Sequence, residues 1–199
     1  MNSEPKNIHQ PAYWQRQYET GHHKWNIGYV STPLKEYFDQ LTNKELRILV
    51  PGAGFGWEAA YLYENGFRHT FALDFSQAAL EKLTQYHPFF PKSNLLQDDF
   101  FEHQGRYDLL VEQTFFSSIP RERRNAYAAK AHSLLRTGGK LVGLLFNHEF
   151  QADSPPFGGS AEEYESIFKP YFHFISFNIC HNSIKPRKGR ELFILLKKK

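Results

Sequence analysis

The stretch Leu46-Arg47-Ile48-Leu49-Val50-Pro51-Gly52-Ala53-Gly54-Phe55-Gly56-Trp57-Glu58-Ala59-Ala60 decides the fold. It begins with an apolar run of the length of a buried strand, continues with three glycines at alternate positions and ends in a helix-forming segment. Glycines between a strand and a helix expose backbone against which a nucleotide-like ligand can lie. We therefore expect a ligand-binding turn at residues 51–56.

The spacing of the three glycines indicates which ligand this turn binds. The dinucleotide fingerprint has its third glycine three residues after the second, and Trp57 occupies that position here. The remaining G-x-G-x-G pattern is similar to the glycine-rich motif of methyltransferases that use S-adenosylmethionine. The alternative is a tight turn without any ligand.

An acidic residue at the end of the next strand-like run favours the ligand-binding alternative. Asp74 ends the run from Thr70, and an ionised carboxylate has two oxygens that can accept both hydroxyls of a ribose. A glycine turn followed at this distance by an acidic strand end is less often a turn without a ligand.

Length, charge and cysteine content indicate one cytoplasmic domain that binds small molecules. A chain of 199 residues can bury one substantial core without disulfides, and the single Cys180 excludes an internal disulfide. The net charge of +3 comes from interspersed acids and bases, so no nucleic-acid stripe is expected. No apolar stretch reaches the length that spans a bilayer, so no membrane segment is expected. The ten histidines are scattered, and no metal is expected. We expect a monomer or a weak dimer.

Strand-like apolar runs alternate with helical segments, as in a parallel sheet that is covered on both faces. Helices are expected within the N-terminal segment 11–38 and at residues 57–65, 76–86 and 121–135, with Ser76 as an N-cap and Gly66 as a C-terminal stop. Strands are expected at residues 46–50, 70–74, 95–97, 108–112, 140–146, 172–180 and 191–196.

The last two expected strands are separated by a turn that is too short for a parallel crossover, so they form an antiparallel hairpin. The predicted fold class is therefore α/β, a Rossmann-like doubly wound sheet of seven strands that is parallel except for a C-terminal antiparallel strand. Residues 1–199 form a single domain, in which residues 1–42 are a helical lid and residues 43–199 are the S-adenosylmethionine-binding core.

Motifs spread from about residue 11 to the C-terminus narrow the class further. They are Trp14-Gln15-x-x-Tyr18, Trp25 with Asn26 to Gly28, Pro51-Gly52-Ala53-Gly54-Phe55-Gly56, Asp74-Phe75-Ser76-x-x-Ala79-Leu80, Asp99-Phe100-Phe101, Tyr107-Asp108-Leu109-Leu110-x-Glu112-Gln113-Thr114-Phe115-Phe116, Pro155-Pro156-Phe157-Gly158-Gly159, and His181-Asn182-Ser183-Ile184-Lys185-Pro186-Arg187 with Gly189-Arg190-Glu191-Leu192-Phe193. Together these motifs resemble the thiopurine S-methyltransferase family, which also contains thiol and halide methyltransferases.

This resemblance implies S-adenosylmethionine as the cofactor, with S-adenosylhomocysteine as its product. The methionine end is expected at Gly52 and Gly54, the ribose at Asp74, and the adenine at the turn 98–100, under a lid of aromatic side chains. The cofactor-binding residues that we expect are Trp14, Trp25, Gly52, Gly54, Gly56, Asp74, Phe75, Asp98, Asp99, Phe100 and Glu112.

No residue is assigned to acid–base catalysis, because the methyl group is already activated on a sulfonium and a thiol or halide needs no strong base. The expected positioning residues are Tyr18, Gln113 and Phe116, and hydrophobic core is the alternative for both Phe115 and Phe116. The expected substrate-binding residues are Tyr18, Gln113, Phe115, Pro155, Pro156 and Phe157.

The last three of these residues belong to the loop 153–160, which follows the fifth strand at the edge where open α/β sheets bind ligands. A surface connector is the alternative for this loop. Arg187 and Arg190 rank low as site residues, because arginines on a hairpin are usually solvated.

Two residues depart from the family pattern. Tyr18 stands where family members often carry Trp, and Gln113 stands where the mammalian thiopurine enzymes carry Arg. An Arg can bind a substrate carboxylate with two hydrogen bonds, whereas Gln offers a neutral amide. A thiopurine is therefore not the natural substrate that we expect.

The predicted function is methyl transfer from S-adenosylmethionine to a small soft nucleophile, which is a thiol, a thiopurine-like heterocycle, a halide or a selenium or tellurium species. One alternative is a nicotinamide-dependent oxidoreductase, which Trp57 and the lack of a Tyr-x-x-x-Lys pair disfavour. The other alternative is a module that binds S-adenosylmethionine without catalysis.

Overall fold

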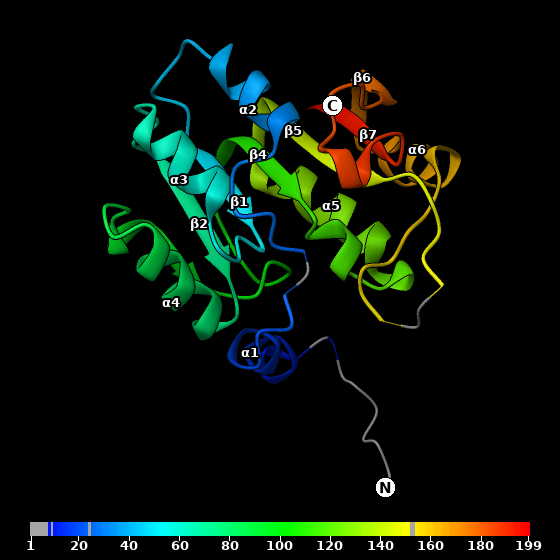
Figure 1. The fold of residues 1–199 in the computed structure, drawn as a ribbon. Helices are drawn as coiled ribbons and strands as arrows, with labels where there is room; N and C mark the ends of the chain where they lie inside the picture. Colours follow the sequence, from blue (N-terminus) through cyan, green and yellow to red (C-terminus); the bar gives the residue numbers. More distant parts are fainter. Residues whose placement is uncertain (1–7, 9, 24, 152–153) are drawn as a thin grey trace, which may run out of the picture.

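The computed structural model describes residues 8, 10–23, 25–151 and 154–199. Within these residues the chain forms one seven-stranded sheet in the order β3-β2-β1-β4-β5-β7-β6, with helices packed on it (Figure 1). The strands are β1 (Ile48–Pro51), β2 (Thr70–Asp74), β3 (Leu95–Gln97), β4 (Tyr107–Gln113), β5 (Leu135–Phe146), β6 (Phe172–Ile179) and β7 (Glu191–Lys198). The helices are α1 (Pro11–Glu19), α2 (Thr32–Asp39), α3 (Trp57–Glu64), α4 (Gln77–Tyr86), α5 (Arg124–Leu134) and α6 (Ala161–Phe168).

The strand directions confirm the predicted fold class. Strands β1 to β5 pair in parallel, while β7 lies between β5 and β6 and is antiparallel to both. Strand β1 pairs with β2 on one side and β4 on the other, so the chain direction across the sheet reverses at β1. The crevice at the carboxyl ends of β1 and β4 is thus the place where a doubly wound sheet binds its ligand.

Both faces of the sheet are buried, which explains the continuous apolar strands of the sequence. Along β1, Leu49 packs into a core with α5 and α6, whereas Ile48 and Val50 pack into a second core with α2, α3 and α4. Side chains alternate between the faces of a strand, so one short strand contributes to both cores. The glycine turn is consequently anchored at its start by a strand that is buried on both sides.

Local sequence signals fix several helix boundaries. Ser76 accepts a hydrogen bond from the Ala79 N–H at 3.4 Å as the N-cap of α4, and Gly66 follows the end of α3 with a φ of +91°. Ser160 caps α6, as expected in the alternative in which the loop 153–160 is a surface connector that ends in a helix cap. The expected helix at 121–135 was wrong in part, because residues 121–123 form a 3₁₀ turn and α5 begins at Arg124.

Each helix in the described part of the chain lacks the length and apolar character needed to cross a lipid bilayer.

Candidate active site

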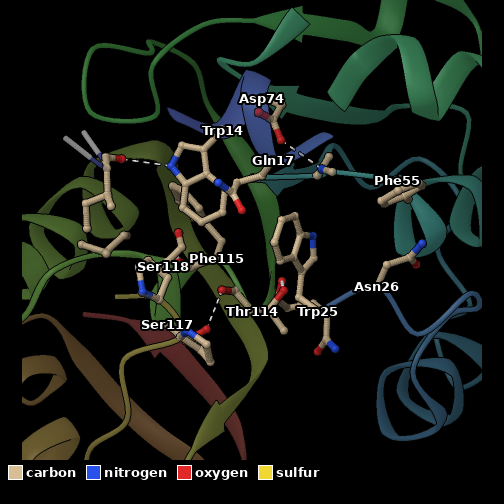
Figure 2. Close-up of a pocket in the computed structure, with 18 of the residues that line it drawn as sticks. Trp14, Gln17, Trp25, Asn26, Phe55, Asp74, Thr114, Phe115, Ser117 and Ser118 are labelled. Carbon is tan, nitrogen blue, oxygen red and sulfur yellow. Dashed lines mark hydrogen bonds between the residues drawn. The ribbon is translucent and has the colours of Figure 1, made fainter. Parts of the chain in front are cut away.

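One cavity of about 770 Å³ lies at the carboxyl ends of β1, β2, β3 and β4, beneath α1 and beside the turn that precedes β7 (Figure 2). Cavities of about 300–1,000 Å³ are typical of sites that enclose a drug-sized ligand. This cavity coincides with the crevice at which the strand order reverses, so the fold itself places the site.

Glycine is required at two positions of the turn that follows β1. Gly52 and Gly54 have φ angles of +57° and +55°, which side-chain-bearing residues rarely adopt. A Cβ atom on Gly52 would overlap the ring of Phe115, and one on Gly54 would lie 2.8 Å from the hydroxyl of Tyr18. Glycine at both positions therefore lets Phe115 and Tyr18 pack against the backbone of this turn.

Asp74 connects the end of β2 to the same turn. Its side chain is buried, and Oδ2 accepts from the Gly54 N–H at 3.0 Å (Figure 2). Oδ1 accepts from the Ser76 N–H at 2.9 Å. Burial raises the pKa of Asp74 to about 6, and the two backbone hydrogen bonds oppose that rise. An ionised carboxylate has room for about four hydrogen bonds, so each oxygen can also accept a ligand hydroxyl.

Aromatic side chains of the N-terminal segment close one side of the cavity. The rings of Trp14 and Trp25 meet edge to face at 5.6 Å, and Tyr18 meets Trp25 in the same way at 5.8 Å. Gln15 on α1 accepts hydrogen bonds from the Ala78 N–H at 3.0 Å and the Ser76 hydroxyl at 3.4 Å. Helix α1 is thus held at the first turn of α4, next to the Asp74 carboxylate.

The turn after β4 forms the opposite wall. Thr114 has a φ of +63°, a strained conformation for a β-branched residue, and it lines the cavity with Phe115. Glu112 supports this turn from behind, where its carboxylate accepts from the Phe116 N–H at 2.8 Å and the Tyr127 hydroxyl at 2.6 Å. Burial raises the pKa of Glu112 to about 7.

The hairpin arginines lie at the cavity, where Arg190 is exposed as expected but Arg187 is buried. Arg187 and Arg190 both line it, and only 9% of Arg187 is exposed. Arg187 forms an ion pair with the buried Glu191 at 3.3 Å and donates to the Trp25 carbonyl at 3.2 Å. Because a buried carboxylate compensates its charge, Arg187 can be removed from solvent.

Most of the residues expected at the site line this cavity: Trp14, Tyr18, Trp25, Gly52, Gly54, Asp74, Phe75, Asp98, Asp99, Phe100, Gln113, Phe115, Pro155 and Pro156. Four of the expected residues do not line it: Gly56, Glu112, Phe116 and Phe157. Asp153, at the start of the expected substrate loop, lies outside the described residues.

Glu112 supports the turn after β4 from behind, as described above, and the other three residues each have a different structural position. A side chain on Gly56 would overlap Leu83 of α4, so this glycine permits helix packing. Phe116 is 1% exposed and lies in the core, the alternative left open by the sequence. Phe157 fixes the loop through its backbone, where its N–H donates to the Ser117 carbonyl at 2.6 Å.

The sequence prediction did not include several residues that line the cavity: Thr114, Ser117, Ser118, Arg123, Phe146 and His148. These residues follow β4 or lie near the end of β5, and this position could have indicated their role. Loops at the carboxyl ends of parallel strands form ligand-binding sites. In the described part of the chain, no group of three His, Cys, Asp or Glu side chains is placed to hold a metal ion. A metal-free site remains a prediction.

The sheet order, the glycine turn and the acidic end of β2 together define a methyltransferase of the S-adenosylmethionine-dependent class. The model of the thiopurine S-methyltransferase family matches residues 9–191, and the chain belongs to that family.

Proteins of known sequence and structure agree with this assignment. The chain is 30% identical to probable thiol methyltransferase 2 of Arabidopsis thaliana over 184 residues, which covers 89% of this chain and 81% of that protein. It is also 30% identical to thiocyanate methyltransferase 1 of Brassica oleracea over 185 residues, with the same coverage. The crystal structure of 1,6-didemethyltoxoflavin-N1-methyltransferase from Burkholderia thailandensis has the same fold, with a TM-score of 0.76, 17% identity and coverage of 100% of this chain and 93% of that one.

Proposed function

We propose that this protein transfers the methyl group of S-adenosylmethionine to the sulfur of a small thiol. The observation that carries this proposal is the continuity of the cavity, which is bordered by the glycine turn and Asp74 on one side and by Arg187 and Arg190 on another. A cationic methyl donor and an anionic sulfur can therefore meet in one cavity. The thiol and thiocyanate methyltransferases among the relatives support a sulfur nucleophile.

The residues of the turn fit the proposed methyl donor. Gly52 and Gly54 line the cavity with backbone, and the buried Asp74 carboxylate supplies acceptors for two ribose hydroxyls. The rings of Trp14 and Trp25 exclude water from the same space, and each ring that faces a sulfonium contributes about 0.5 to 2 kcal/mol of cation–π attraction. We assign the donor to this part of the cavity.

When bound, S-adenosylmethionine supplies a methyl group that its sulfonium has already activated, so the protein has to position the nucleophile rather than activate the donor. A free thiol has a pKa of about 8.5, and neighbouring positive charge favours the thiolate. Arg190 supplies that charge at the cavity wall, whereas the charge of Arg187 is compensated by Glu191. The thiol proton leaves to solvent, and the new carbon–sulfur bond forms as the methyl–sulfonium bond breaks.

Thiocyanate, halides and selenium or tellurium anions are the second group of candidate methyl acceptors in the same cavity. They are also soft and anionic, so the arginines and the aromatic walls suit them as well. Gln113 lines the cavity with a neutral amide, and for that reason we do not propose a thiopurine as the natural substrate.

A methylation screen with isotope-labelled S-adenosylmethionine tests the proposal. The acceptors are aliphatic thiols, aromatic thiols, thiopurines, thiocyanate, iodide and selenite, each offered to the full chain. We expect the highest kcat/KM for a small thiol, with a methyl thioether as the product. If the protein binds S-adenosylmethionine but methylates none of the sulfur nucleophiles, the proposed substrate class is wrong.

A further inference from the structure

A fully buried arginine lies behind the cavity and does not line it. Arg124 is the first residue of α5, and its exposed fraction is 0%. A positive charge at a helix N-terminus opposes the helix dipole, and burying a guanidinium costs free energy unless its donors are hydrogen-bonded. The position of Arg124 is therefore unfavourable for α5 itself, and its partners indicate what it does instead.

The guanidinium of Arg124 holds two successive carbonyl groups of the loop that follows β5. Nη2 donates to the Phe157 carbonyl at 3.1 Å, and Nη1 donates to the Gly158 carbonyl at 2.9 Å. Nη1 also donates to Oε1 of Glu163 on α6 at 2.8 Å, and this carboxylate compensates the charge. Because an arginine presents its donors as a rigid planar fork, it fixes both carbonyls in one geometry.

Two buried rings keep the guanidinium in place. Its central carbon lies 4.8 Å from the centre of the Phe116 ring and 5.5 Å from the centre of the Tyr164 ring. Each of these rings is 1% exposed. The donors that hold the loop are therefore fixed before any ligand binds.

The loop is closely packed at the same point. A Cβ atom on Gly158 would overlap the His148 carbonyl oxygen, so residue 158 can lie there only as glycine. The next N–H, that of Gly159, donates to the same His148 carbonyl at 3.1 Å. Arg121 donates to the Gly158 carbonyl at 3.2 Å from the exposed side. Residues 157–159 are thus held by side chains and by backbone together.

This anchoring reaches the cavity through the backbone. Pro155 and Pro156 line the cavity, and Phe157 directly follows them. The ring of a proline fixes its φ angle, so a displacement of Phe157 carries the two prolines with it rather than being absorbed by them. Arg124 therefore controls a part of the cavity wall that its own side chain does not form.

We propose that Arg124 is a positioning residue for the methyl acceptor and sets the width of the acceptor that the cavity admits. Its hydrogen bonds to residues 157 and 158 hold Pro155 and Pro156 at the wall. This inference rests on the proposed function, which places the acceptor in the same cavity. The methyl donor is assigned to other elements, the turn after β1 and the end of β2. Loss of the two hydrogen bonds should therefore change acceptor selection and leave donor binding unchanged.

Two aliphatic thiols of different width, ethanethiol and cyclohexanethiol, test this inference. We expect wild type to have the higher kcat/KM for ethanethiol, measured with isotope-labelled S-adenosylmethionine. A displacement of about 1 Å in a positioning group can change a rate about 100-fold. We expect the ratio of the two kcat/KM values to fall at least about fivefold in Arg124→Lys and Arg124→Met. The Kd of S-adenosylmethionine, measured by isothermal titration calorimetry, should equal that of wild type.

The two substitutions and a control separate positioning from general stability. Arg124→Lys keeps the charge beside Glu163 but lacks the planar fork, whereas Arg124→Met removes both. Leu134→Ala is the matched control, because Leu134 is 2% exposed and lies at the opposite end of α5. It loosens the same helix without removing a hydrogen bond to the loop, and it should keep the wild-type ratio.

The outcomes distinguish this inference from the proposed function. If wild type methylates both thiols equally well, if the Arg124 variants keep the wild-type ratio, or if Leu134→Ala lowers it to the same extent, the inference is wrong while the proposed function stands. If wild type methylates neither thiol, the proposed function fails and the inference fails with it. Where Arg124→Met does not fold, Arg124→Lys and Arg121→Met decide, since both should lower the ratio and the second removes only an exposed donor to the Gly158 carbonyl.

Discussion

Replacing Asp74 by Asn separates its role in binding from its role in stability. At the site, the carboxylate is assigned to two ribose hydroxyls, and a hydrogen bond to a charged acceptor contributes about 1 to 1.5 kcal/mol more than a neutral one. Loss of this difference at both hydroxyls amounts to about 2 to 3 kcal/mol, which is roughly a 30- to 150-fold increase in the Kd of S-adenosylmethionine. Isothermal titration calorimetry at pH 7.5 measures this change.

The effect of the same substitution on stability depends on pH. Burial raises the pKa of Asp74 from 3.8 to about 6, so the folded protein disfavours the ionised form. The contribution of Asp74 to the free energy of unfolding is therefore highest below pH 3.8, and it falls as the pH rises through about 6. A difference of about two pKa units corresponds to about 3 kcal/mol. Asn does not titrate and keeps only one of the two acceptor oxygens. Without ligand, the free energy of unfolding of wild type minus that of Asp74→Asn should therefore fall by about 3 kcal/mol between pH 3 and pH 7, measured by urea denaturation.

The pH dependence of binding gives a further check on Asp74. Protonation removes the acceptor charge, so the wild-type Kd for S-adenosylmethionine should rise as the pH falls below about 6, while the Kd of Asp74→Asn stays nearly constant. Asp108→Asn is the control, because Asp108 lies at the opposite end of β4 and accepts from the Arg47 N–H. An unchanged Kd in Asp74→Asn at pH 7.5 would refute the ribose assignment.

Three other substitutions test the walls of the site. Gly54→Ala should raise the Kd of S-adenosylmethionine at least tenfold, because the new Cβ would lie 2.8 Å from the Tyr18 hydroxyl. Adding Tyr18→Phe to this variant should restore part of the affinity in calorimetry. No recovery would contradict the assigned clash. Gln15→Leu removes an acceptor from the first turn of α4, which costs about 1 kcal/mol. Stopped-flow measurements should therefore show roughly fivefold faster release of S-adenosylmethionine from this variant. The control Gln15→Glu keeps the acceptor and should keep the wild-type rate. Arg187→Met leaves Glu191 buried without its partner and should lower the free energy of unfolding by about 3 to 5 kcal/mol in urea denaturation. The double variant Arg187→Met with Glu191→Gln should recover most of that loss. An equal loss in the single and the double variant would argue against the ion pair.

The strand segments, and the glycine turn and Asp74 at the cavity, could be predicted from the sequence because they depend on local patterns. A short apolar run followed by Gly52 and Gly54 can only be a strand that enters a tight turn, and Asp74 ends the next apolar run. Parallel strands bring their carboxyl ends to one edge of the sheet. Residues that are 20 positions apart in the sequence therefore meet, and the hydrogen bond from Gly54 to Asp74 follows from the fold.

The hairpin arginine could not be ranked from the sequence, because its burial depends on contacts that no local pattern records. Arg187 reaches the Trp25 carbonyl, 162 positions away, and its charge is compensated by a buried carboxylate on β7. An arginine near a turn, with glycine and lysine beside it, has the local sequence of a solvated residue. Only the packing of the N-terminal segment against this hairpin removes Arg187 from solvent.

The pair Phe115 and Phe116 shows where periodicity stops being informative. Within β4, side chains alternate between two known faces, but the strand ends at Gln113, and Thr114 then turns the backbone with a φ of +63°. After that turn neither the strand period nor the helix period applies, so the sequence cannot say which ring faces the cavity. The structure directs Phe115 to Gly52 and Phe116 to the core, and the Glu112 carboxylate fixes this choice by accepting the Phe116 N–H. A residue outside the cavity thereby determines which aromatic side chain forms its wall.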